Sequence, residues 1–317
     1  MEGLAKAAGH REEPLEDSCR GLLLPGERKS VEPMAARLHP ERVQAAHQSL
    51  YHRVAKAPWS DEAVLAAVRV QLPPAMTCRQ TIVAWIVDET AIPKKGRHSV
   101  GVARQYCGQL GKQENGQGAV TLSVATGQAS LPVAWRLDLV REWAEDRARR
   151  KKAGVPEEVK FPTKPEMARD QIRPALASDL PRGVVLADAG CGSDTRFRES
   201  LSGLGLPYVV GVLSTTSVWG PGMGPLPAKP RGRMGRPPKL LRRSRNHRPV
   251  SVRELGGLGR KALRRLRWRE GTNKKLPSRL VAVRVRPAHR DYGRAEPHPE
   301  LWLLAEWPRG AAEPTKY

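Results

Sequence analysis

Two short apolar runs, each followed by an aspartate, place the strongest constraint on how this chain of 317 residues can fold. Residues 82–87 read Ile-Val-Ala-Trp-Ile-Val and end in Asp88, and residues 184–187 read Val-Val-Leu-Ala and end in Asp188. Short continuous apolar runs are typical of strands that are buried on both faces. Because such a sheet needs helices against it, the runs predict a mixed α/β domain.

The segments around these runs fill in that domain. Apolar residues alternate over 119–125 and 131–137, which predicts an antiparallel meander, and Asn115-Gly116 supplies a turn signal before it. Asp194 or Ser193 is expected to cap the helix after the second run. Helices are expected over residues 141–153 and 165–180, and strands over 208–213, 279–286 and 301–307.

The first 78 residues predict a small helical module. Pro40 suits the first turn of a helix whose apolar residues recur at helical spacing over residues 43–54. Ser60 is a good N-cap for a second helix, and Pro73-Pro74 is expected to end it. No catalytic motif is visible in this module.

The charge of the chain favours a polyanionic partner. The net charge is +23, and residues 229–275 hold eighteen Lys and Arg against Glu254 and Glu270, which is +16 of the total. Nucleic acid is the commonest partner of so basic a protein, although ribosomal association or an anionic membrane surface would give the same charge. No apolar run approaches the roughly 20 residues that cross a bilayer, and residues 1–21 do not resemble a secretory signal.

Within the basic segment, Gly235-Arg236-Pro237 is similar to the core of an AT-hook, which places arginine in a narrow minor groove. The alternative is a disordered basic loop that touches phosphates without sequence preference. Either interpretation predicts DNA binding that weakens steeply with salt. The expected DNA-binding residues are Arg231, Arg233, Arg236, Lys239, Arg242, Arg243, Arg245, Arg264, Arg265 and Arg267.

Asp88 and Asp188 are the candidate catalytic residues. If their strands are parallel neighbours, the two carboxylates lie side by side and repel one another unless a cation lies between them. Mg²⁺ prefers such oxygen ligands, and two ions can activate an attacking oxygen and stabilise a leaving one. The alternative is that each aspartate only caps or turns out of its own strand.

Longer stretches carry a family resemblance. Residues 85–126, beginning WIVDETAIPKKG, resemble the first catalytic region of bacterial insertion-sequence transposases in the DDE superfamily endonuclease group, and GVVLADAGCGSDTRFRESL resembles the second. The resemblance implies an RNase H-like fold over residues 79–317, with the basic segment as an insertion at about 219–278. It also implies that Asp88 and Asp188 are metal-binding catalytic acids for Mg²⁺ or Mn²⁺.

The same resemblance implies that the partner is double-stranded DNA, both the transposon ends and the target. It is also compatible with a homodimer in the synaptic complex. A cytoplasmic, nucleoid-associated bacterial protein is expected. Glu89 stands where a second Asp is usual, and Cys191 stands where Tyr is usual. These departures suggest relaxed selection or a diverged copy.

The family's third acid is a Glu in a Tyr-x-x-Arg-x-x-x-Glu signature, downstream of the strand that LWLLAEW resembles. Glu300, Glu306 and Glu313 lack that context, so the chain is expected to be truncated at its C-terminus relative to the family. The alternative function is a catalytically inactive transposase remnant that only binds DNA.

One competing enzyme class remains. The sequence Asp188-Ala-Gly190-Cys-Gly192 resembles the glycine-rich turn of a nucleotide- or methyl-donor-binding fold. Asp194 holds the position of the third glycine, and no acid ends the next predicted strand, which argues against a methyltransferase. The four cysteines form no CxxC pair, so neither a zinc site nor a disulfide framework is expected.

Overall fold

The computed structural model describes residues 12–317 except 27, 58–59, 79, 231–237, 259–262, 270–274 and 309–310. At residues 12, 72, 258, 267–269 and 275–277 it describes the backbone alone. The chain divides into two compact units. The first runs to Pro162 and includes Met167–Val184, and the second joins Thr163–Glu166 to Val185–Tyr317. The boundaries expected for the helical module and the basic insertion stay predictions.

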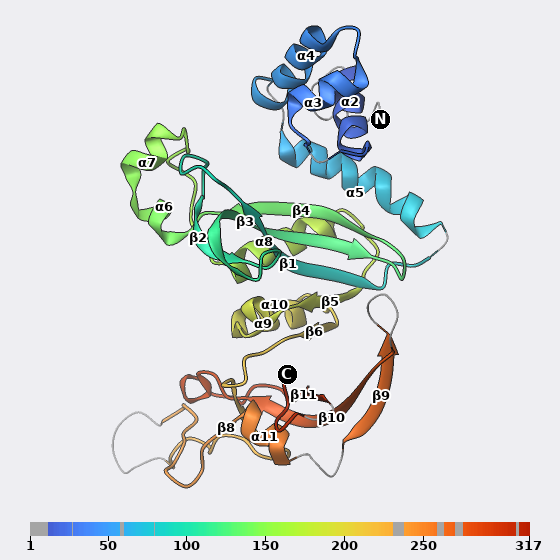
Figure 1. Cartoon of the computed structure of the whole chain (residues 1–317). Helices are drawn as coiled ribbons and strands as arrows, with labels where there is room; N and C mark the ends of the chain where they lie inside the picture. The colour runs from blue at the N-terminus through green and yellow to red at the C-terminus, as the bar shows by residue number, and fades with distance from the viewer. Residues whose placement is uncertain are drawn as a thin grey trace. The chain divides into compact units, whose positions relative to one another are not determined.

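The described part of the first unit begins with four helices: α2 (Glu12–Leu23), α3 (Val31–Leu38), α4 (Val43–Ala55) and α5 (Asp61–Thr77) (Figure 1). Met34 and Ala35 of α3 pack against Ala46 and Leu50 of α4 in a small core of their own. The helix expected from Pro40 begins three residues later, because Pro40 lies in a turn.

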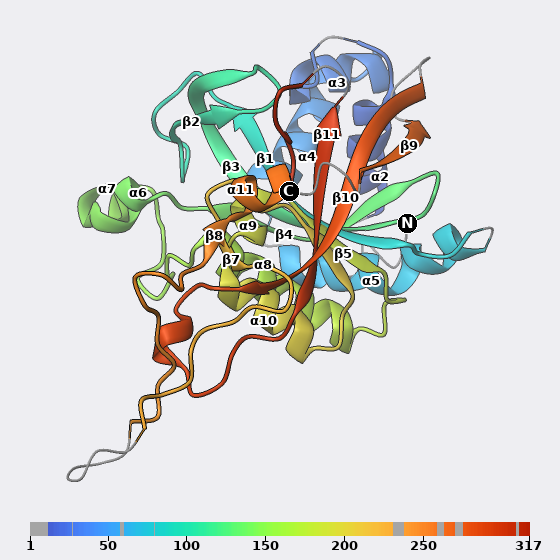
Figure 2. The same ribbon diagram turned by 90° about the horizontal axis from the view of Figure 1, so that it is seen from below.

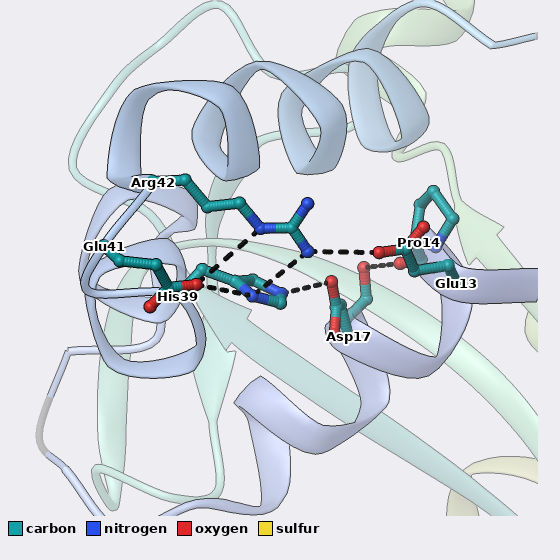
Figure 3. Close-up of polar contacts among 7 residues, drawn as sticks. Glu13, Pro14, Asp17, His39, Glu41 and Arg42 are labelled. Carbon is teal, nitrogen blue, oxygen red and sulfur yellow. Dashed lines mark hydrogen bonds and ion pairs between the residues drawn. The ribbon is translucent and has the colours of Figure 1, made fainter.

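A polar cluster ties α2 to the turn before α4 (Figure 3). His39 Nε2 lies 2.8 Å from Asp17 Oδ2, and both side chains are largely buried. Arg42 Nη2 donates to Glu13 Oε1 at 3.2 Å. These contacts fix the connection between the helices where the apolar core is too small to do so alone.

Helix α5 begins as predicted and ends later than predicted. Ser60 Oγ accepts a hydrogen bond from Ala63 N at 3.2 Å, which confirms the N-cap. The expectation that Pro73-Pro74 ends the helix is wrong, because α5 continues to Thr77. Two prolines remove two N–H donors but fix φ near its helical value, so a last turn on an exposed helix end can follow them.

Buried Arg69 joins α5 to the neighbouring sheet. Its guanidinium donates to the carbonyl oxygen of Val133 at 3.2 Å and pairs with Glu62 at 2.5 Å. The helical segment and the sheet are therefore parts of one compact unit.

The sheet of the first unit is made by β1 (Ala84–Pro93), β2 (Ala103–Cys107), β3 (Lys112–Ala125) and β4 (Ser130–Asp138). Strands β2, β3 and β4 form the predicted antiparallel meander. The long strand β3 pairs antiparallel with each of the other three. The turn signal at Asn115-Gly116 was misinterpreted, because both residues lie inside β3 and the turn precedes them, at 108–111 between β2 and β3. A Cβ on Gly116 would come within 2.8 Å of the carbonyl oxygen of Ile92, so close strand approach explains this glycine.

Helices complete the first unit. The single helix expected over 141–153 is two, α6 (Arg141–Glu145) and α7 (Arg147–Lys152), because Asp146 breaks the run and caps α7 through Arg149 N at 2.8 Å. Helix α8 (Lys164–Ala177) continues past Pro174. Its buried Gln171 donates to the carbonyl oxygen of Val120 at 2.9 Å, which joins α8 to β3.

From Val185 onward the second unit contains a strand–helix–strand segment: β5 (Val184–Ala187), α9 (Ala189–Gly192), α10 (Thr195–Gly203) and β6 (Tyr208–Val210). Strands β5 and β6 pair in parallel. Phe197 and Leu201 of α10 are fully buried. A Cβ on Gly192 would lie 2.1 Å from the carbonyl oxygen of Gly211, so this position accepts only glycine.

A second sheet follows, made by β7 (Ser217–Trp219), β8 (Val250–Ser251), β9 (Arg264–Arg269), β10 (Lys275–Pro287) and β11 (Leu301–Pro308). Strand β10 pairs antiparallel with β7, β9 and β11 (Figure 2). Helix α11 (Val252–Leu258) contributes Val252 and Leu255 to the core beneath this sheet.

Residues 229–275 were expected to be loop-like, and this is wrong for α11, β8 and β9. The sequence patterns there are short and rich in arginine, so tertiary packing decides their structure. The α/β class, with parallel and antiparallel strand pairs and flanking helices, is confirmed. Among the described residues, no helix is both long and apolar enough to cross a membrane.

Candidate active site

Asp88 is the fifth of the ten residues of β1, whereas the apolar run predicted it at the end of a strand. The apolar residues cover only the first, more buried part of the strand: Val87 is buried and Asp88 is exposed. Asp88 faces Thr121 in the antiparallel register with β3, and the Thr121 hydroxyl donates to the carbonyl oxygen of Asp88 at 3.2 Å. The pairing holds the aspartate on a rigid strand with an accessible side chain.

Asp188 directly follows β5, as predicted, and its side chain is also exposed. Its Oδ1 accepts hydrogen bonds from Gly190 N at 3.0 Å and Cys191 N at 3.3 Å. The aspartate therefore does cap its turn, as the alternative interpretation expected, but only one carboxylate oxygen is used for this. Asp194 caps α10 through Phe197 N at 2.7 Å, as predicted.

Within the first unit, the chain that leads into β5 lies against the start of β1. Val184 N donates to the carbonyl oxygen of Val83 at 3.0 Å. A Cβ on Gly183 would lie 2.7 Å from Ala84 N, so glycine permits this approach. The indole N–H of Trp85 donates to the carbonyl oxygen of Pro181 at 2.9 Å and adds a third contact.

The donor chemistry of the two aspartates suits a hard divalent cation. Oδ1 of Asp88 accepts from Glu89 N at 2.8 Å, and Oδ2 of each aspartate has no hydrogen-bond partner within the described residues. Carboxylate oxygens are the ligands that Mg²⁺ and Mn²⁺ prefer. Across the described part of the chain, no group of three or more His, Cys, Asp or Glu side chains is arranged to hold a metal.

The three late glutamates have other partners. Glu300 lies 3.4 Å from Arg286, Glu306 lies 3.7 Å from Lys316, and Glu313 lies 3.0 Å from Arg253. Glu306 is in β11, as the sequence indicated. Each ion pair supplies a structural reason for the carboxylate.

The ten expected DNA-binding residues have different surroundings. Arg231, Arg233 and Arg236 lie outside the described residues, as does the side chain of Arg267. The Arg243 guanidinium lies 2.7 Å from the buried carboxylate of Asp291, and Arg242 Nε donates to the carbonyl oxygen of Pro227 at 3.1 Å. The remaining four are exposed and belong to the second unit: Lys239, Arg245, Arg264 and Arg265.

Sequence reasoning missed a basic pocket in the second unit, where Arg198, Arg243, His289 and Arg290 line one cavity. Burial of Arg198 lowers its pKa from the usual value, and nearby Tyr208, Asp194 and Glu199 offset part of that effect. Partial burial, followed by the charges of Arg290 and Arg198, lowers the pKa of His289 below 6.5.

Comparison with known proteins gives two matches. The family described as DDE superfamily endonuclease matches residues 1–275. A protein of Microchaete diplosiphon, described as a probable transposase for insertion sequence element IS701, is 33% identical over 168 residues. That alignment covers 53% of this chain and 41% of the relative, so it spans less than half of the relative's length.

Proposed function

The chain belongs to the DDE superfamily endonucleases, and from this premise we propose that it is a DDE-type transposase that cleaves and transfers DNA strands at insertion-sequence ends. The observation that carries the proposal is the pair of exposed aspartates, Asp88 on β1 and Asp188 directly after β5. The α/β architecture agrees with the RNase H-like fold of the family. Transposon ends and target DNA are the proposed partners, with a homodimer as the assembly that acts on them near the nucleoid.

Asp88 and Asp188 are the proposed metal ligands, for Mg²⁺ or Mn²⁺. Two such ions, when bound, would supply an activated water or 3′-hydroxyl and stabilise the leaving oxygen of a phosphodiester. The N–H groups of Gly190 and Cys191 orient the Asp188 carboxylate through Oδ1, which leaves Oδ2 for a ligand. The ladder between β1 and β3 orients Asp88.

The proposal requires the two carboxylates to share an ion. Asp88 is five residues beyond Val83, and Asp188 is four residues beyond Val184, whose N–H donates to the Val83 carbonyl. This spacing is the one that parallel neighbouring strands need to bring the two carboxylates to adjacent positions. A shared cation would remove the repulsion between them.

The basic residues of the second unit are proposed to contact DNA phosphates. Lys239, Arg245, Arg264 and Arg265 are exposed, which leaves them free to do so. Each phosphate contact removed by a change to Gln should reduce the slope of log affinity against log salt by about one unit. Loss of affinity with an unchanged slope would argue against direct phosphate contacts.

A second candidate function is DNA binding without cleavage, as in an inactive remnant. The observation that favours it is that no third acid joins Asp88 and Asp188 within the described residues. A missing metal ligand would lower the rate by orders of magnitude, because it stabilises charge in the transition state.

Nicking of supercoiled plasmid with Mg²⁺ or Mn²⁺ separates the two candidates. Asp88→Asn and Asp188→Asn remove one charge each with little change in shape. Asp146→Asn is a matched control, because Asp146 is also an exposed capping aspartate. Nicking that both site variants lose and the control keeps supports the transposase. Salt-sensitive DNA binding without nicking by the unsubstituted protein supports the second candidate.

A further inference from the structure

The basic pocket of the second unit is a cavity of about 440 Å³, which is within the range of small-molecule sites. Its walls carry three arginines and a histidine: Arg198, Arg243, His289 and Arg290. Hydroxyl groups of serine, threonine and tyrosine residues supply most of the remaining polar lining, and no Asp or Glu of the described residues lines the cavity.

The pocket lies beyond the carboxyl ends of two parallel strands. Ser193 and Thr195 follow β5, and Leu213 and Thr215 follow β6. The Ser193 hydroxyl accepts a hydrogen bond from Leu213 N at 3.0 Å, which joins the two loops. Ligands of α/β proteins bind in this position, outside the carboxyl ends of parallel strands.

Arg198 is the observation that points to a charged ligand. Its side chain is buried, with 7% of the residue exposed, and it donates to the carbonyl oxygen of Gly192 and to the Thr195 hydroxyl. No carboxylate of the described residues lies within 4.0 Å of its guanidinium. A buried charge is costly without a counter-ion, so an anion in this cavity would stabilise Arg198.

The neighbouring carboxylates are already neutralised. Asp291 lies 2.7 Å from Arg243 and accepts from the indole N–H of Trp219, and Glu199 lies 2.8 Å from Arg294. Arg198 and Arg290 therefore remain as the cations in excess. Arg290 is exposed and lies in the left-handed region, with φ of 54°, so the chain holds it in a conformation that non-glycine residues seldom adopt.

We propose that this pocket binds the phosphate group of a nucleotide, with Arg198 and Arg290 as the charged donors. Arginine is suited to this because its planar fork matches phosphate oxygens. The cavity has room for part of the attached nucleoside. The phosphate belongs either to a DNA strand, in which case the site adds to the proposed transposase function, or to a free nucleotide.

Calorimetric titration with inorganic phosphate and with deoxyadenosine 5′-monophosphate, at constant ionic strength in chloride, tests the pocket. Arg290→Gly removes one donor and keeps the backbone, because glycine accepts positive φ. Arg248→Ala is the control, since Arg248 is exposed in the same unit and does not line the pocket. The proposal predicts saturable binding that weakens roughly tenfold in Arg290→Gly and changes less than about twofold in the control.

Arg198→Lys is a second variant, which keeps the buried positive charge but lacks the planar guanidinium group. It should also bind phosphate more weakly than the unsubstituted protein. Absence of saturable binding, or equal losses in Arg290→Gly and Arg248→Ala, would overturn the proposal. Melting curves of each variant show whether the fold is kept.

Competition against a fluorescent DNA duplex and single strand identifies the source of the phosphate. Displacement of DNA by the monophosphate, lost in Arg290→Gly, assigns the site to a DNA phosphate. Monophosphate binding that leaves DNA binding unchanged assigns it to a free nucleotide. Neither measurement requires cleavage, so failure of the proposed transposase activity would leave these results unaffected.

Discussion

The N–H of Val184 donates to the carbonyl oxygen of Val83 at 3.0 Å. This hydrogen bond joins the first residue of β5 to the residue directly before β1. Gly183 permits the contact, since a Cβ there would lie 2.7 Å from Ala84 N. Asp88 follows Val83 by five residues, and Asp188 follows Val184 by four. Glycine at position 183 therefore permits the close approach of the segment that leads to Asp188 to the start of β1.

Asp188→Ala should destabilise the second unit more than Asp188→Asn. Asp188 accepts from two backbone N–H groups, and asparagine caps about as well as aspartate, whereas alanine leaves both donors without a side-chain partner. The expected loss in the free energy of unfolding is about 1 kcal/mol for alanine and a few tenths for asparagine. Urea unfolding of both variants measures it, and equal stabilities would mean that the cap contributes nothing.

Asp291→Asn should destabilise the second unit strongly. The Asp291 carboxylate is 1% exposed and accepts from Trp219 Nε1 at 2.7 Å and from Arg243 Nε at 2.9 Å. Removing its charge leaves Arg243 without a counter-ion and costs about 3 kcal/mol. Thermal melting compared with Asp170→Asn, an exposed aspartate 3.8 Å from Arg136, checks this. Similar melting temperatures for both variants would contradict it.

Arg290→Gly should stabilise the protein while weakening phosphate binding. A non-glycine residue at φ 54° is strained, and glycine relieves about 1 kcal/mol of that strain, less its own entropy cost. A melting temperature at or above that of the unsubstituted protein, with weaker phosphate binding, is the expected combination. A lower melting temperature would mean that the Arg290 side chain makes a stabilising contact.

His289 should make stability rise with pH. Burial, with Arg290 and Arg198 nearby, lowers the pKa of His289 below 6.5 in the folded chain, so the unfolded chain takes up a proton first as the pH falls. Its contribution is therefore complete above 6.5 and is lost as the pH falls from 6.5 to the lowered pKa. Unfolding of His289→Gln across this range should show a weaker pH dependence. An unchanged dependence would contradict the assignment to His289.

The sequence predicted elements where one pattern dominates. The alternation in β3 and β4, the Ser60 cap and the Asp194 cap each follow from local chemistry, and the structure confirms them. The end of β1 could not be predicted in this way. The continuous apolar run ends at Val87, but β1 remains paired with β3 to Pro93. Backbone hydrogen bonds can extend a strand beyond its buried part, and an apolar run does not reveal this.

The basic residues show a different limit. Arg243 and Arg245 are two positions apart and look alike in sequence, yet Arg243 pairs with buried Asp291 while Arg245 is exposed. The partner lies 48 positions away along the chain, so no local pattern reveals it. Arg198 is similar, since only the fold brings it to the same cavity as His289 and Arg290.

Calorimetric titration with Mn²⁺ tests the central claim most directly. The protein, Asp88→Asn, Asp188→Asn and the double variant would be compared, with Asp146→Asn as the control. If the two carboxylates hold the same ion, each single variant should lose at least about tenfold in affinity, since even outer partners of a metal ligand contribute that much, and the double variant should lose little more. Unchanged affinity in both single variants, or losses that add as for independent sites, would contradict a metal centre shared by Asp88 and Asp188.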